Sequence, residues 1–134
     1  MHSAEQQPLQ LRGLIVDDQI LVCELMAGVL EYFGFGVAGF AHDGREAIDK
    51  ARTLQPDFIV MDGYMPEMNG IEATQKILEE RAVPIVICTG MMDAHLIDQA
   101  KEAGASAFLV KPFPTERLQS ILNQVLGARA LPAA

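Results

Sequence analysis

The sequence predicts an open α/β sandwich, a parallel sheet of five strands covered by helices on both sides. Three observations lead to this prediction. Short apolar runs alternate with longer amphipathic ones along about 120 residues, which is typical of repeated strand–helix–strand units. Glycine, proline, aspartate and asparagine residues separate the runs, as expected at helix ends. The chain of 134 residues has room for one core, and five units are too few for a barrel of eight.

The five expected strands are short, apolar and rich in β-branched residues. The third, with Phe-Ile-Val-Met, is continuously apolar, so we expect it to be buried on both faces. Pro84 lies near the start of the expected strand at 83–88, a position at which proline is tolerated. The strands are expected at residues 11–16, 36–41, 57–62, 83–88 and 107–110.

The helices between the strands are indicated by apolar residues at helical spacing. In the first helix, Leu21, Leu25, Val29 and Phe33 recur every four positions, which is the pattern of one helical face. Gly34 then occupies the left-handed position that ends many helices. The helices are expected at residues 19–33, from 43–44 to a stop before 55, from 69–70 through 78, and at 93–103 and 115–126.

Composition excludes several classes of protein. Ten basic against eighteen acidic residues give a net charge of −8, so nucleic acid would be repelled over most of the surface. The longest strongly apolar runs are too short to cross a bilayer, and the N-terminus lacks the pattern of a secretory signal. We therefore expect a cytoplasmic protein without membrane insertion. Its cysteines, Cys23 and Cys88, are expected to be free buried thiols, and its histidines, His2, His42 and His95, ordinary surface residues.

Polar residues stand at the ends of four expected strands. Asp17 and Asp18 follow the first strand, Asp62 ends the third, Thr89 the fourth and Lys111 the fifth. Because parallel strands bring their carboxyl ends to one edge of a sheet, these side chains should lie together. Clustered carboxylates favour a hard divalent cation such as Mg²⁺. A lysine and a hydroxyl group at the same edge can bind a phosphoryl group.

Four motifs make the chain resemble the receiver domain of two-component response regulators. They are LIVDDQ at 14–19, VMDGYMPEMNG at 60–70, VICTG at 86–90 and GASAFLVKPF at 104–113, in family order and with family spacing. The resemblance covers nearly the whole chain. It implies a doubly wound, flavodoxin-like sheet with strand order 2-1-3-4-5. Gly63 departs from the family pattern, which more often has a bulkier apolar residue at that position.

The resemblance also assigns roles to the residues at the strand ends. Asp62 would be the phospho-acceptor. Its carboxylate, Asp18 and the backbone carbonyl of Tyr64 would bind Mg²⁺, and Mn²⁺ can take the place of this ion. Asp17 would bind the ion directly or through water. Lys111 would pair with the phosphoryl group and precede a cis proline. Thr89 would hydrogen-bond the phosphoryl group and act in switching. Phe108 would be the aromatic switch residue.

The expected protein is a phospho-accepting receiver that catalyses only its own phosphorylation and dephosphorylation. Its donor would be a histidine kinase or a histidine phosphotransfer protein. A downstream protein would bind the face made by the fourth helix, fifth strand and fifth helix, with no direct contact to nucleic acid. We expect a tail at 1–9, a receiver domain at 10–127 and a tail at 128–134, as a monomer or a weak phosphorylation-dependent dimer. Two alternatives are a receiver excised from a hybrid kinase or larger regulator, and a small phosphatase with an aspartate nucleophile.

Overall fold

The computed structural model describes residues 10–65, 67–90 and 94–127. The expected tails at 1–9 and 128–134, and the start of the fourth helix at residue 93, lie outside these ranges. Ten elements alternate along the described chain, as the sequence predicts. They are β1 (Arg12–Val16), α1 (Ile20–Tyr32), β2 (Gly36–Ala41), α2 (Gly44–Leu54), β3 (Phe58–Asp62), α3 (Gly70–Glu80), β4 (Ile85–Thr89), α4 (Ala94–Ala103), β5 (Ala107–Val110) and α5 (Thr115–Leu126).

The five strands form one parallel sheet in the order β2-β1-β3-β4-β5. Both the parallel sheet and the strand order implied by the resemblance are therefore confirmed. The register sets the ends of the strands side by side, because Val16 of β1 lies opposite Met61 and Asp62 of β3 lies opposite Cys88. The residues that follow Val16 thus emerge beside Asp62, at the edge where the sequence predicts the site.

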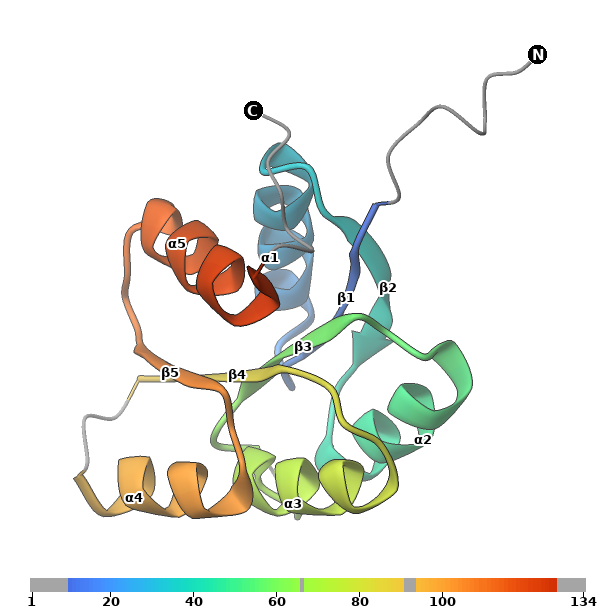
Figure 1. Cartoon of the computed structure of the whole chain (residues 1–134), viewed down its shortest axis with the longest axis vertical. Coiled ribbons are helices and arrows are strands. Elements are labelled where there is room, and N and C mark those ends of the chain that lie inside the picture. Colours follow the sequence, from blue (N-terminus) through green and yellow to red (C-terminus); the bar gives the residue numbers. More distant parts are fainter. Residues whose placement is uncertain (1–9, 66, 91–93, 128–134) are drawn as a thin grey trace.

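Helices cover both faces of the sheet (Figure 1): α1 and α5 lie on one face, and α2, α3 and α4 on the other. Each face has its own buried apolar cluster because residues alternate along a strand. On the α1–α5 face, Phe58 and Val60 pack with residues such as Leu30 and Leu118. On the α2–α4 face, the cluster contains Ile59 and Met61 of the same strand.

Helix α1 does not bury the stripe that its spacing predicts. The fully buried residues of α1 are Cys23 and Leu30, whereas the side chains of Leu21 and Leu25 are each 72% exposed. Residues four positions apart on a helix drift by about 40° per step, so a stripe with that spacing winds away from the core. The apolar face that the spacing indicates is therefore not buried in the N-terminal half of α1, which leaves apolar side chains on the surface.

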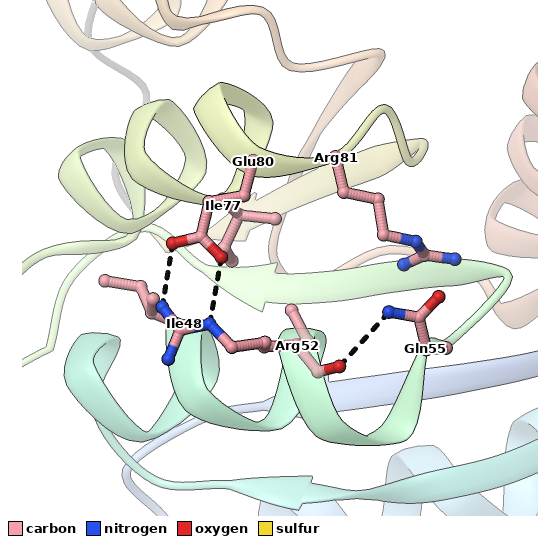
Figure 2. Close-up of a pocket in the computed structure, with 7 residues that line it drawn as sticks. Ile48, Arg52, Gln55, Ile77, Glu80 and Arg81 are labelled. Carbon is pink, nitrogen blue, oxygen red and sulfur yellow. Dashed lines mark hydrogen bonds and ion pairs between the residues drawn. The ribbon is translucent and has the colours of Figure 1, made fainter.

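Helices α2 and α3 begin where the sequence predicts, each with a side-chain cap, and contact each other near their C-terminal ends. The side chains of Asp43 and Asn69 accept hydrogen bonds from the third backbone N–H of α2 and α3, at 2.8 and 2.9 Å. Near the C-terminal ends, the Arg52 guanidinium donates two hydrogen bonds, of 3.0 and 2.7 Å, to the Glu80 carboxylate (Figure 2). These contacts fix α2 against α3 at the end of the sheet opposite Asp62.

The two cysteines are free and buried, as predicted. Burial raises the pKa of the Cys88 thiol to about 12, and burial followed by the charge of Asp17 raises that of Cys23 to about 11. Both thiols therefore stay protonated at neutral pH. In the described part of the chain, no helix combines the length and apolarity needed to span a membrane.

Candidate functional site

Three carboxylates meet at the carboxyl edge of the sheet. Asp17 and Asp18 follow β1, and Asp62 is the last residue of β3, its neighbour in the sheet. Each of the three offers a carboxylate oxygen, and these oxygens all lie within 4.8 Å of one another. Asp17 is buried, Asp62 is partly buried and Asp18 is exposed. The sequence prediction that these side chains converge is thus correct.

Burial, together with the two neighbouring carboxylates, makes ionisation of Asp62 unfavourable. The pKa of Asp62 is raised above its ordinary value, mainly by burial and further by the charges of Asp17 and Asp18. Two groups oppose this shift: the backbone N–H of Tyr64, which donates to Asp62 Oδ1 at 3.2 Å, and the ammonium of Lys111. The balance leaves the ionised form of Asp62 less favourable than it is in water.

Lys111 pairs with the most buried of the three carboxylates. Its Nζ lies 3.1 Å from Asp17 Oδ2, while the backbone N–H of Gln19 donates to Asp17 Oδ1 at 2.9 Å. Burial by itself disfavours the ammonium, but the hydrogen bond to Asp17 and the charges of Asp62 and Asp17 outweigh it and raise the pKa of Lys111. The lysine is therefore charged at neutral pH. The bond from Lys111 to Pro112 is cis, as the resemblance implied.

Thr89 and Phe108 lie on the α2–α4 side of the site. Thr89 ends β4 and is fully buried, and its carbonyl accepts a hydrogen bond of 2.7 Å from the Lys111 backbone. Phe108 pairs with Ile87 in the β4–β5 register and packs, partly buried, against the apolar cluster of the α2–α4 face. Thr89 is thus next to the position paired with Asp62, and Phe108 is one strand further out.

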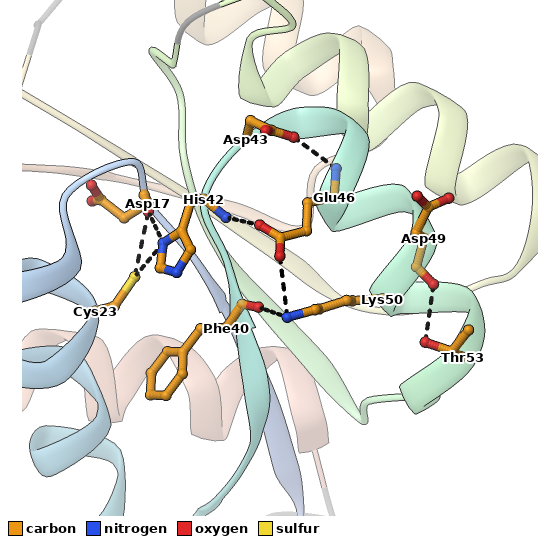
Figure 3. A network of polar contacts seen from close by, with 9 residues as sticks. All are labelled: Asp17, Cys23, Phe40, His42, Asp43, Glu46, Asp49, Lys50 and Thr53. Carbon is orange, nitrogen blue, oxygen red and sulfur yellow. Dashed lines mark hydrogen bonds and ion pairs between the residues drawn. The ribbon is translucent and has the colours of Figure 1, made fainter.

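A second layer beneath Asp17 was not foreseen from the sequence (Figure 3). The Asp17 carbonyl accepts from His42 Nδ1 at 3.1 Å and from the Cys23 thiol at 3.4 Å. A carbonyl can only accept, so Nδ1 carries the proton. The expectation that His42 is an ordinary surface residue was wrong: it is partly buried and holds the backbone of Asp17. A signal existed, because His42 directly follows β2, which neighbours β1.

The donor set fits a divalent cation. Carboxylate oxygens are the ligands that Mg²⁺ prefers, and among the described residues Lys111 pairs with just one of the three carboxylates, that of Asp17. Asp17, Asp18 and Asp62 are the residues that could hold it. That the backbone carbonyl of Tyr64 is a ligand stays a prediction. The roles of Thr89, Lys111 and Phe108 in phosphoryl binding and switching also stay predictions. The side chain of Tyr64 is exposed.

Comparison with known proteins agrees with the fold. The family described as "Response regulator receiver domain" matches residues 14–123. The chemotaxis protein CheY of Thermotoga maritima is 40% identical over 115 residues, which are 85% of this chain and 96% of that protein.

Two solved structures show the same likeness. A LuxR-family response regulator from Aurantimonas sp. SI85-9A1 superposes with a TM-score of 0.84 at 32% identity, covering 90% of this chain and 88% of that one. The Borrelia burgdorferi CheX–CheY complex, whose title includes BeF3 and magnesium, has a TM-score of 0.81 at 25% identity and covers 86% of this chain and 88% of that one.

Proposed function

Since this chain belongs to the response regulator receiver domain family, we propose that Asp62 accepts a phosphoryl group from a phosphohistidine of a histidine kinase or histidine phosphotransfer protein. The observation that carries the proposal is the meeting of Asp17, Asp18 and Asp62 beside the ammonium of Lys111. We take the receiver unit to span residues 10–127. The proposal places the protein in the cytoplasm, where it switches a protein-interaction face.

The transfer is an in-line displacement at phosphorus. A carboxylate oxygen of Asp62 forms the new P–O bond while the P–N bond to the donor imidazole breaks, and the bonding pair returns to the imidazole nitrogen. Lys111 offers an ammonium, and Thr89 a hydroxyl group, to the transferred oxygens, so the chain contributes positioning and charge neutralisation. The partial burial of Asp62 shields the acyl phosphate from water on the side of the sheet.

A divalent cation completes the charge balance in this proposal. Asp18, Asp62 and the Tyr64 carbonyl would hold it, with Asp17 as a direct or water-mediated ligand. When bound, Mg²⁺ neutralises the carboxylates and the phosphoryl oxygens that approach them. Its fit is supported by the meeting of three carboxylates at this edge, where Lys111 pairs with Asp17.

Phosphorylation would be read out on the α4–β5–α5 face. Thr89 at the end of β4 and Phe108 on β5 connect the acceptor edge with this face, because the two strands are hydrogen-bonded neighbours. A ligand on Asp62 that draws the Thr89 hydroxyl toward itself would change the packing around Phe108. The downstream protein would bind the arrangement that phosphorylation favours.

The proposed function is tested by labelling the purified chain with acetyl phosphate. We expect the mass of one phosphoryl group to be added in Mg²⁺, the adduct to map to Asp62, and a chelator to abolish the reaction because the carboxylates then repel the incoming phosphate. Intact mass measurement and peptide mapping of the trapped acyl phosphate give the result. Labelling that is equally fast in the chelator, or that maps to another residue, would contradict the proposal.

The exposed apolar side chains of α1 support a docking site for the donor. A groove of about 280 Å³ runs between α1 and the start of α5, and its lining includes Leu25, Met26, Phe113 and the site lysine Lys111. A phosphohistidine that reaches Asp62 must bring its own helix over the rim of the acceptor site. We propose that this helix packs on Leu21 and Leu25, because their exposed apolar area would otherwise face water.

If the donor docks on α1, Leu25→Asp should slow phosphotransfer from a protein donor without slowing labelling by acetyl phosphate. Phosphotransfer from a histidine kinase or phosphotransfer protein that phosphorylates the wild type should slow about tenfold or more, because a charge replaces an apolar contact. Labelling by acetyl phosphate, which needs no docking, should keep its rate. Tyr32→Asp is the matched control, since Tyr32 is 85% exposed at the other end of α1. Equal slowing by both variants, or by neither, would argue against the docking site.

A further inference from the structure

The carboxylate of Asp18 is the one at the site that its own contacts hold least. The Asp17 carboxylate accepts a hydrogen bond from Lys111, and the Asp62 carboxylate accepts one from the backbone N–H of Tyr64. Asp18 is exposed, and no described residue donates a hydrogen bond to its carboxylate. The place of Asp18 beside the other two carboxylates is therefore set by its backbone.

That backbone is fixed at the peptide unit that joins Asp17 to Asp18. A peptide unit is planar, so fixing the direction of the Asp17 carbonyl also fixes the point from which Asp18 departs. His42 Nδ1 donates to this carbonyl at 3.1 Å, and the N–H of Asp17 donates to the Ala41 carbonyl at 3.0 Å. Two consecutive residues thus hold the backbone of Asp17 from both sides.

The His42 ring takes the place of a backbone donor. Strand β2 ends at Ala41, and the N–H of His42 donates to the Glu46 carboxylate at 2.7 Å instead of continuing the ladder with β1. The other described group that donates to the Asp17 carbonyl is the Cys23 thiol, at 3.4 Å, and a thiol is a weak donor. The ring therefore supplies the strong side-chain hydrogen bond to this carbonyl.

Helix α2 holds His42 in turn (Figure 3). Glu46, whose Oε1 accepts from the His42 N–H, lies with its Oε2 3.2 Å from Lys50 Nζ. Lys50 Nζ also donates to the Phe40 carbonyl of β2, at 2.6 Å. These contacts fix the end of β2 against the first turns of α2. The direction of the His42 ring is thus set by two elements of the fold.

We propose that His42 is a positioning residue for the divalent cation, because it holds the Asp17 carbonyl and thereby keeps the Asp18 carboxylate where it can bind Mg²⁺ together with Asp62. The inference rests on the proposed function. Without the bond from His42, the peptide unit between Asp17 and Asp18 could turn more freely, and binding would have to order it. Groups that hold metal ligands in place commonly change metal affinity by about tenfold or more.

The experiment compares two substitutions of similar shape at position 42. In His42→Asn, the side-chain amide can still donate from the position of Nδ1, whereas His42→Leu has no donor. Mg²⁺ is titrated into metal-free ¹⁵N-labelled protein, and backbone amide resonances give the dissociation constant. We expect this constant to rise about tenfold in His42→Leu and to stay within about threefold of the wild type in His42→Asn.

A second measurement follows the peptide unit in the absence of metal. The N–H of Asp18 belongs to the unit whose carbonyl His42 holds, so its order parameter should fall in His42→Leu and be regained in His42→Asn. Melting temperatures in chelator show that each variant is folded. Should His42→Leu not fold, His42→Phe takes its place, since it keeps a ring but has no donor.

Thr53→Val is the matched control. The Thr53 hydroxyl also donates to a backbone carbonyl, that of Asp49 at 3.2 Å, but it is exposed near the C-terminal end of α2. Valine removes this donor with little change of shape, so the dissociation constant for Mg²⁺ and the order parameter of Asp18 should both stay at the wild-type values.

The results that overturn the inference differ from those that overturn the proposed function. A wild type that binds Mg²⁺ and is labelled at Asp62 supports the proposed function, and one that does neither contradicts it. If the wild type does both, a folded His42→Leu variant with wild-type affinity for Mg²⁺ contradicts only the inference. His42→Asn binding as weakly as His42→Leu, or Thr53→Val weakened to the same extent, also contradicts it.

Discussion

Asp62→Asn is expected to reduce labelling by acetyl phosphate in Mg²⁺ to background. An amide presents no anionic oxygen to attack phosphorus, and the two other carboxylates at the site, Asp17 and Asp18, are the proposed ligands of the cation. The loss should be seen as the absence of the phosphoryl adduct by intact mass measurement. Asp49→Asn is a matched control, because that carboxylate lies on α2 with a side chain 66% exposed, and it should label like the wild type.

The same variant should be more stable than the wild type when metal is removed. Burial and the charges of Asp17 and Asp18 raise the pKa of Asp62, so its ionised form at neutral pH costs folding free energy that an amide avoids. We expect the melting temperature in chelator to rise by about a few degrees. The increase shows that lost labelling is not lost folding. Labelling that persists in Asp62→Asn would contradict the assignment of the acceptor, and a variant that melts well below the wild type would contradict the predicted stabilisation.

Gly70→Ala is expected to be the most destabilising of the substitutions considered for this chain. A Cβ atom at position 70 would lie 2.1 Å from the Asp62 carbonyl oxygen and 3.1 Å from both the Asp62 carbonyl carbon and Met61 Cγ. The first distance is far inside van der Waals contact, and the atom concerned belongs to the backbone. Either the start of α3 or the end of β3 has to move, which should cost about 3 kcal/mol or more.

Urea or thermal unfolding measures this loss, and Gly28→Ala is the control. Gly28 lies within α1, and nothing is within 4 Å of an added Cβ, so alanine there should leave stability unchanged or raise it by up to about 1 kcal/mol through helix propensity. Because the clash is with the acceptor residue itself, whatever Gly70→Ala protein remains folded should also be labelled more slowly. A variant that melts like the wild type would show that α3 does not approach β3 as closely as described.

Much of the fold could be predicted because it depends on local patterns. The left-handed Gly34, the helix starts at 43–44 and 69–70 and the apolar strand runs each have a local physical cause, and the structure has them where the sequence places them. The meeting of Asp17 and Asp62 was also predictable, since the ends of parallel strands meet at one edge. The exposure of Leu25 was not, because a spacing of four residues does not reveal which side of a helix faces the sheet.

The amino-acid sequence by itself determined the alternation of strands and helices, the acidic edge and the family of this protein. Only the tertiary structure decided that the His42 ring lies under Asp17, that α1 leaves an apolar surface beside Lys111, and that Gly63 lies against Ile87 and Thr89. The physical reason is the range of the interactions. Caps and periodicity act over a few residues, whereas Gly63 and Thr89, 26 positions apart, come to lie against each other only once β3 and β4 have paired.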